Sequence, residues 1–215
     1  MKLNALKYLT LSGIVGSILF TCVSLLCGFF KTEYDPFHNF ISELGATNSS
    51  TENLMNSIGF IPSGILFCLF GFSIFVVVAN NLTSKIGSIL IMVFGLGMTL
   101  AGIFSCDAGC PPNGTMESII HDRVSAVTFI SAIAGIILLG INLRKIRTFR
   151  SISLYVTLTG FVSLILLVLM VSSFEARHLT GLWQRLLLLS FFTWSIIVGL
   201  KVYKNFSILS ADEEK

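Results

Sequence analysis

Residues 124–143 read VSAVTFISAIAGIILLGINL, an apolar run that contains no Asp, Glu, Lys or Arg. A helix of about 20 residues crosses a hydrocarbon core of roughly 30 Å, so a run of this length predicts a transmembrane helix. Lipid offers no partner to backbone N–H and C=O groups, so a spanning run must be a helix or part of a closed barrel. Barrel strands alternate apolar and polar residues, whereas this run is continuously apolar. We therefore expect a helix.

Five further runs share this length and character, and they indicate how the whole chain is organised. The 215 residues are 54% hydrophobic and 12% charged, whereas soluble domains have about 25% charged residues. A chain so poor in charge cannot cover its surface with polar side chains. The sequence therefore predicts an all-α polytopic integral membrane protein, a six-transmembrane-helix bundle formed by one domain over residues 1–215. The six helices are expected at about 9–30, 54–78, 86–104, 124–143, 152–172 and 182–202.

The distribution of basic residues predicts the orientation of the bundle. An even number of helices puts both termini on one side, and that side holds ten of the 14 Lys and Arg residues. Short cytoplasmic loops are enriched in Lys and Arg, so we expect both termini in the cytoplasm. The expected location is the cell (plasma) membrane, with membrane lipid as the partner. The net charge of +3 is too small to indicate nucleic-acid binding.

The opposite, outer side receives most of the other ionisable groups. Eight of the 11 acidic residues and all three histidines fall in the expected outer loops. A polar site at the outer membrane face is therefore predicted. Its candidate residues are Ser42, Glu43, Asp107, His121, Asp122, His178 and Arg185. Three histidines with an open position for water are a known catalytic zinc set. Zinc is therefore the candidate cofactor, and the candidate metal ligands are His38, His121 and His178. No two of these histidines have the spacing of a common metal-binding motif.

The first outer loop contains a candidate short helix over residues 35–45. Asp35 followed by Pro36 is a favourable helix start, and Gly45 suits the helix end. Side chains four residues apart share a helix face, so His38 would lie beside Ser42. Asn39 and Glu43 would form a second such pair. The alternative is a surface helix whose polar residues are only solvated.

The second outer loop holds Cys106 and Cys110. In the expected topology both face an oxidising compartment, which favours a disulfide. Two free thiols and a zinc site that adds His121 are the alternatives. Ion pairs could tie the outer loops together, and we expect Glu43–Arg185 and Asp107–Arg123 as typical pairs.

Several segments resemble a prokaryotic membrane-protein family, domain of unknown function 998. They are 40–46 (FISELGA), 56–61 (NSIGFI), 101–107 (AGIFSCD), His121-Asp122 and 181–186 (GLWQRL). They follow one another in the right order and cover most of the chain. The resemblance implies six helices and no established activity. A more distant similarity is to the six-helix Frag1/DRAM/Sfk1 group, which is linked to lipid remodelling and lipid asymmetry, and it implies a fold-level analogy only.

Three functions are compatible with this pattern. The preferred hypothesis is a lipid-binding or lipid-handling protein without catalysis, in which outer polar residues tie the loops together. The first alternative is a metal-dependent lipid hydrolase or remodelling enzyme, and the second is a small-molecule transporter. The lack of charge at mid-membrane argues against an ion-coupled transporter. Catalysis gains support if Glu43, Asp107 and His121 converge on an open cavity, and a structural role gains support if each is held by an arginine or the backbone.

Overall fold

The computed structural model describes the backbone of residues 3–212 and the side chains of residues 5–207. Within this part of the chain every regular element is helical. Two elements are not α-helices, because η1 is a 3₁₀ helix and η2 is a π-helix. The elements are α1 (Leu3–Leu9), α2 (Ser12–Phe30), η1 (Ile41–Gly45), α3 (Glu52–Leu54), η2 (Met55–Phe60), α4 (Ile61–Val77), α5 (Leu82–Ile103), α6 (Met116–Leu143), α7 (Arg150–Ser172) and α8 (Thr180–Asp212).

Six helical segments are long and apolar enough to cross a membrane, which confirms the predicted helix count for the described residues. All six begin before the expected residue, and polar caps explain the early starts of the third and the fourth. The Asn81 side chain accepts a hydrogen bond from the Ser84 N–H, and Thr115 does the same for Ser118. The early start of α6 places His121 inside the helix. The segments are Ala5–Phe30, Glu52–Val77, Leu82–Ile103, Met116–Leu143, Arg150–Ser172 and Thr180–Ser207.

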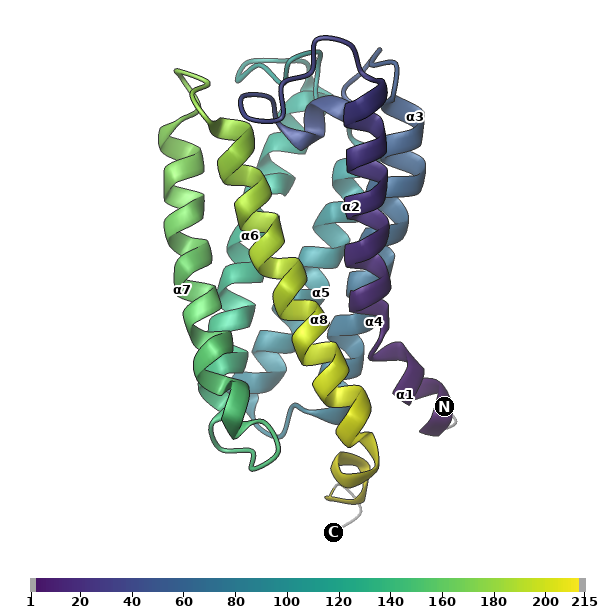
Figure 1. Ribbon diagram of the computed structural model, residues 1–215, viewed down its shortest axis with the longest axis vertical. Helices are drawn as coiled ribbons and strands as arrows, with labels where there is room; N and C mark the ends of the chain where they lie inside the picture. Colours follow the sequence, from purple (N-terminus) through teal and green to yellow (C-terminus); the bar gives the residue numbers. More distant parts are fainter. Residues whose placement is uncertain (1–2, 213–215) are drawn as a thin grey trace.

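The spanning helices form a ring in chain order (Figure 1). Each packs against the next, from α2 through α4, α5, α6 and α7 to α8, and α8 returns to contact α2. Glycines bring neighbouring helices close. A Cβ on Gly95 would lie 2.6 Å from the Gly64 carbonyl oxygen, and one on Gly140 would lie 2.7 Å from the Thr157 nitrogen. Such small residues permit close helix packing where no hydrophobic effect drives it.

Aromatic side chains fill the centre of the ring. Phe67 packs edge-on against Phe94 and stacks with Phe192, and Phe70 meets Trp194. Polar contacts also join helices. The hydroxyls of Ser17 on α2 and Ser195 on α8, both buried, lie 2.8 Å apart, and those of Ser163 on α7 and the half-buried Ser190 on α8 lie 2.7 Å apart. The middle of the bundle is thus a packed core rather than a channel.

The two ends of the bundle differ. Both termini lie at one end, which we call the terminal end (Figure 1). The other end carries the longer connections, residues 31–51, 104–115 and 173–179, and is called the loop end. The placement of the terminal end in the cytoplasm stays a prediction from the basic residues.

The helix predicted over residues 35–45 is wrong. The Asp35 side chain does accept from the Phe37 N–H at 2.8 Å, and the Asn39 N–H donates to the Asp35 carbonyl oxygen at 2.8 Å, but the helical path ends after this single turn. Phe40 is extended, and the chain resumes as η1. The interruption separates His38, which is exposed, from Ser42. Glu43 nevertheless accepts from Asn39 at 3.0 Å, because its carboxylate turns back over the break.

Candidate functional site

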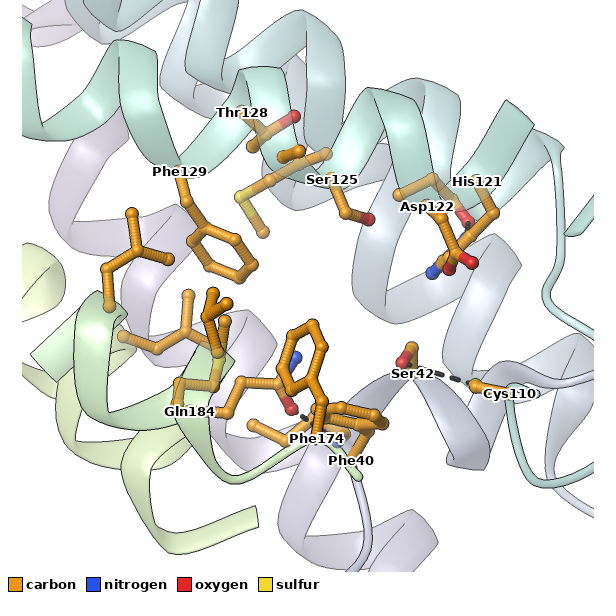
Figure 2. Close-up of a pocket in the computed structure, with 18 of the residues that line it drawn as sticks. Phe40, Ser42, Cys110, His121, Asp122, Ser125, Thr128, Phe129, Phe174 and Gln184 are labelled. Atoms are coloured by element: carbon orange, nitrogen blue, oxygen red, sulfur yellow. Dashed lines mark hydrogen bonds between the residues drawn. The ribbon is translucent and has the colours of Figure 1, made fainter. Parts of the chain in front are cut away.

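A cavity of about 400 Å³ opens at the loop end between α6 and α7 (Figure 2). We call it the α6–α7 cavity. Close glycine contacts join α6 to α7 nearer the terminal end, at Gly140 and Gly160, and the cavity occupies the wider space between them at the loop end. Its polar lining residues are Ser42, Cys110, His121, Asp122, Ser125, Thr128, Glu175, Arg177 and Gln184.

The lining changes from polar to apolar with depth. Along α6, His121, Asp122 and Ser125 come first, and Phe129 and Ile130 follow toward the middle of the bundle. Thr128 also lies in this deeper turn, but its hydroxyl donates to the Val124 oxygen at 2.6 Å. At 1.5 Å per residue this stretch covers roughly 14 Å, about half of a hydrocarbon core. Aromatic and aliphatic side chains of the other helices complete the lining, namely Phe20, Phe60, Phe94, Met98, Leu167, Met170 and Leu188.

His121 is held in one tautomer by the backbone. It is 4% exposed, and its Nδ1 lies 2.8 Å from the Phe104 oxygen and 3.2 Å from the Ala101 oxygen. Both partners are acceptors, so Nδ1 must carry a proton and donate it. Nε2 is then the ring atom left to meet a ligand. Asp122 does not orient this ring, in keeping with its position as the adjacent residue on a helix.

The predicted disulfide between Cys106 and Cys110 is present. It places Cys110 in the cavity lining, where the Ser42 hydroxyl lies 3.5 Å from its sulfur (Figure 2). A disulfide sulfur has no proton, so the hydroxyl donates. Ser42 is therefore a cavity residue, but it contacts sulfur rather than a histidine or carboxylate base.

Three further side chains offer unused polar groups to the cavity. Gln184 accepts from the Ile41 N–H at 2.7 Å through its oxygen, which leaves its amide N–H groups. Within residues 5–207, Asp122 and Ser125 form no hydrogen bond with another side chain or the backbone. Glu175, also in the lining, is exposed and forms no ion pair among residues 5–207. The shallow part of the cavity thus combines two unpaired carboxylates, those of Asp122 and Glu175, with neutral donors and acceptors.

Glu43 does not line the cavity and instead has a structural role in the first loop. Its carboxylate accepts from the Phe40 N–H at 2.9 Å and pairs with Arg177 at 3.2 Å. Arg177 also donates to the Gly109 and Cys110 carbonyls, both at 2.8 Å. The expected Glu43–Arg185 pair is wrong, because Arg177 takes that place and joins all three loops.

Asp107 also has a structural role. Its carboxylate accepts from the Thr115 N–H at 2.6 Å and from the Thr115 hydroxyl at 2.9 Å, which closes the second loop onto the start of α6. The expected Asp107–Arg123 pair is wrong, since Arg123 is exposed and makes no ion pair among the described residues. Glu43, Asp107 and His121 are therefore held by an arginine or the backbone, the outcome that favours a structural role for them.

The three histidines are not brought together. His38 and His178 are exposed, with ring centroids 6.1 Å apart, while His121 is buried against the second loop. In the part of the chain that the structure describes, no three His, Cys, Asp or Glu residues form a group with metal-binding geometry. His38 instead lies 2.8 Å from the Asp35 carboxylate. The Phe37 N–H and then His38 lower the pKa of that carboxyl group.

Asn56 connects two loops to the bundle and was not singled out from the sequence. The π-helix η2 directs it inward, where its amide donates to the Gly45 oxygen at 2.8 Å and to the Ser105 hydroxyl at 3.0 Å. A Cβ on Gly45 would lie 2.1 Å from the Asn56 side-chain oxygen, so glycine is required there. Arg177 and Gln184 were also missed as site residues. The family-like segments contain Asn56 and Gln184, and this was the available signal.

Arg185 belongs to a second depression of about 370 Å³ between α2 and α8, which we call the α2–α8 groove. The guanidinium donates to the Asn39 oxygen at 3.1 Å, to the Gly181 oxygen at 2.9 Å and to the Tyr34 hydroxyl. Burial raises the pKa of Tyr34 to about 12, against the lowering effect of Arg185. Nearby, Lys31 donates to the Glu43 carbonyl, and burial lowers its pKa.

These features define a multi-pass membrane protein with six spanning helices, a polar-to-apolar cavity at one end and three loops tied over it. The chain belongs to the family described as protein of unknown function (DUF998), which it matches over residues 14–201. Searches of curated proteins and of solved structures found no match.

Proposed function

We propose that the protein binds a polar lipid in the α6–α7 cavity, with the headgroup at the loop end. The observation that carries the proposal is the change of lining from polar to apolar over roughly 14 Å of α6. Pockets for small ligands have volumes of about 300–1,000 Å³, and 400 Å³ lies in that range. A headgroup and the upper part of one acyl chain match this depth, and the rest of the lipid extends between α6 and α7.

The charge of the lining favours a headgroup that carries an amine or hydroxyls. Asp122 and Glu175 contribute carboxylates, and the positive charge of Arg177 is already paired with Glu43. Carboxylates accept hydrogen bonds only, and Asp122 is exposed with no protein partner for its side chain among residues 5–207, so it is available to a donor of the headgroup. In the same lining, Gln184 adds its amide N–H groups as donors, and His121 adds its Nε2 ring nitrogen.

The test fills the cavity without disturbing the loops. Ser125→Phe puts a ring into the cavity, and Val127→Phe puts the same ring on the lipid-facing side of α6, where Val127 is 56% exposed. Phosphatidylethanolamine bound to detergent-purified protein is measured by native mass spectrometry. We expect binding to fall about tenfold or more in S125F, because the ring takes the space of a chain segment, and to stay unchanged in V127F. Equal binding in both variants would refute the proposal.

Hydrolysis of a lipid in the same cavity is the second candidate function. The observation that favours it is the free Nε2 of His121, which the backbone contacts of Nδ1 leave available as a general base. Ser42 is the hydroxyl in the same lining, although its present contact is Cys110. Release of fatty acid from phosphatidylethanolamine by the purified protein, abolished in His121→Gln, would support this function. Lipid binding without release in the wild type would exclude it for that substrate.

A further inference from the structure

Among the side chains that the structure describes, the positive charge of Arg185 has no counter-charge. Among residues 5–207, the two ion pairs are His38–Asp35 and Arg177–Glu43, and neither includes Arg185. Its partners are two carbonyl oxygens and the Tyr34 hydroxyl. With its pKa raised to about 12, Tyr34 stays neutral at physiological pH and supplies no negative charge. Arg185 lies in the second turn of α8, at the loop end, and a charge on a spanning helix is costly unless it is paired or reaches the membrane interface.

The guanidinium also retains unused donors. It has five N–H groups in a planar fork, and the three contacts with Asn39, Gly181 and Tyr34 use three of them. Tyr34 donates its own proton to the Phe40 oxygen at 3.0 Å, so it must accept from Arg185. Two N–H donors remain, which is the number that a phosphate accepts in a bidentate contact.

The surroundings of Arg185 indicate that this phosphate belongs to a lipid. The groove lies between two spanning helices, and its lining includes Leu25 and Leu189, which are 69% and 56% exposed. Such apolar side chains at the mouth suit acyl chains rather than water. The groove lining holds no carboxylate among the described residues, in contrast to the α6–α7 cavity. Arg185 therefore sets the charge of the groove.

We infer that the α2–α8 groove is a binding site for an anionic lipid, whose phosphate accepts the two free N–H donors of Arg185 while one acyl chain lies along Leu25 and Leu189. The site is separate from the lipid site proposed in the α6–α7 cavity. Neither Arg185 nor Tyr34 lines that cavity, so each proposal can fail without the other.

The experiment compares phosphatidylglycerol with phosphatidylcholine of the same acyl chains, each added to detergent-purified protein and measured by native mass spectrometry. Arg185→Gln removes the charge. Ser24→Trp blocks the groove from α2 and leaves every contact of Arg185 in place, since Ser24 bonds only to the Thr21 oxygen. We expect the wild type to prefer phosphatidylglycerol and each variant to lose that preference, with binding about tenfold weaker.

Two matched controls make the result specific. Arg123→Gln removes an exposed positive charge at the same end of the bundle, and Val15→Trp places a ring on the lipid-facing side of α2. Both should bind phosphatidylglycerol like the wild type. If R185Q fails to fold, as judged by thermal unfolding, S24W alone decides. The inference is overturned if S24W keeps the preference, if R123Q loses as much as R185Q, or if the wild type binds both lipids equally.

Discussion

The α6–α7 cavity and the α2–α8 groove lie side by side at the loop end and differ in charge. They share Phe20, Ile41 and Leu188 in their linings. The cavity holds two carboxylates and an arginine that is already paired, whereas the groove holds one unpaired arginine. The difference shows how one apolar bundle can present opposite charges in neighbouring spaces, because ion pairing in the loops decides which charge remains available.

Asn56→Leu should break both regions together and have the largest effect. The change leaves the Gly45 oxygen and the Ser105 hydroxyl without their donor, and each unpaired buried group costs about 1–3 kcal/mol. We expect unfolding free energy to fall by about 3 kcal/mol, with loss of phosphatidylethanolamine and phosphatidylglycerol binding.

The neighbouring Ser57→Leu is the control, because Ser57 is exposed. Thermal unfolding in detergent measures stability, and native mass spectrometry measures the lipids. If N56L unfolds like S57L, Asn56 does not support the loop end.

Replacing the disulfide by the double change Cys106→Ser and Cys110→Ser should separate the two regions. The bridge closes a loop of few residues, and chain entropy for such a loop gives about 2 kcal/mol of stability. The Cys110 carbonyl also holds Arg177 over the cavity. We expect weaker binding in the cavity and unchanged binding of phosphatidylglycerol in the groove.

The control for the disulfide is Cys22→Ser, which removes an exposed free thiol. Equal losses of both lipids in the double variant would mean that the two regions depend on the second loop alike. Such a result would contradict the separation of the two linings.

Asp122→Asn should have the smallest effect and sharpen the difference in charge. It removes one of the two unpaired carboxylates of the cavity and preserves the shape of the side chain. We expect phosphatidylethanolamine binding to fall about tenfold, equivalent to about 1.4 kcal/mol, with no change in phosphatidylglycerol binding. Glu33→Gln, an exposed acid in the first loop, should change neither. A loss in both variants would point to general surface charge instead.

The sequence was sufficient for the six helices because each apolar run is as long as a membrane is thick. It also predicted the disulfide, since Cys106 and Cys110 share one loop on one side. Those features depend on local pattern. The helix over residues 35–45 failed because tertiary contacts decide it: the Ile41 N–H bonds to Gln184 on α8, a partner 143 residues away, and the backbone at Phe40 extends to reach it.

The site was partly predictable. Ser42, His121 and Asp122 do line one cavity, while Glu43 and Asp107 support loops and His178 lies outside. The choice of arginine partner explains why the ion pair of Glu43 was predicted wrongly. From the sequence alone, both Arg177 and Arg185 are possible partners, because both lie at the same end of the bundle as the first loop. Which of them meets Glu43 depends on the conformation of the third loop, where Arg177 has a positive φ of 51°, a feature that no pattern of residue types indicates.

Phe20, Ile41 and Leu188 line both the cavity and the groove, and this shared lining has a thermodynamic consequence. Ile41 touches both spaces and its N–H is held by Gln184, so an occupant that moves η1 on one side changes the free energy of binding on the other. Such coupling is reciprocal: the factor by which the first occupant changes the affinity for the second equals the factor in the opposite direction. With both lipids bound as proposed, the composition of the surrounding bilayer would thereby change the affinity of the cavity for its own ligand.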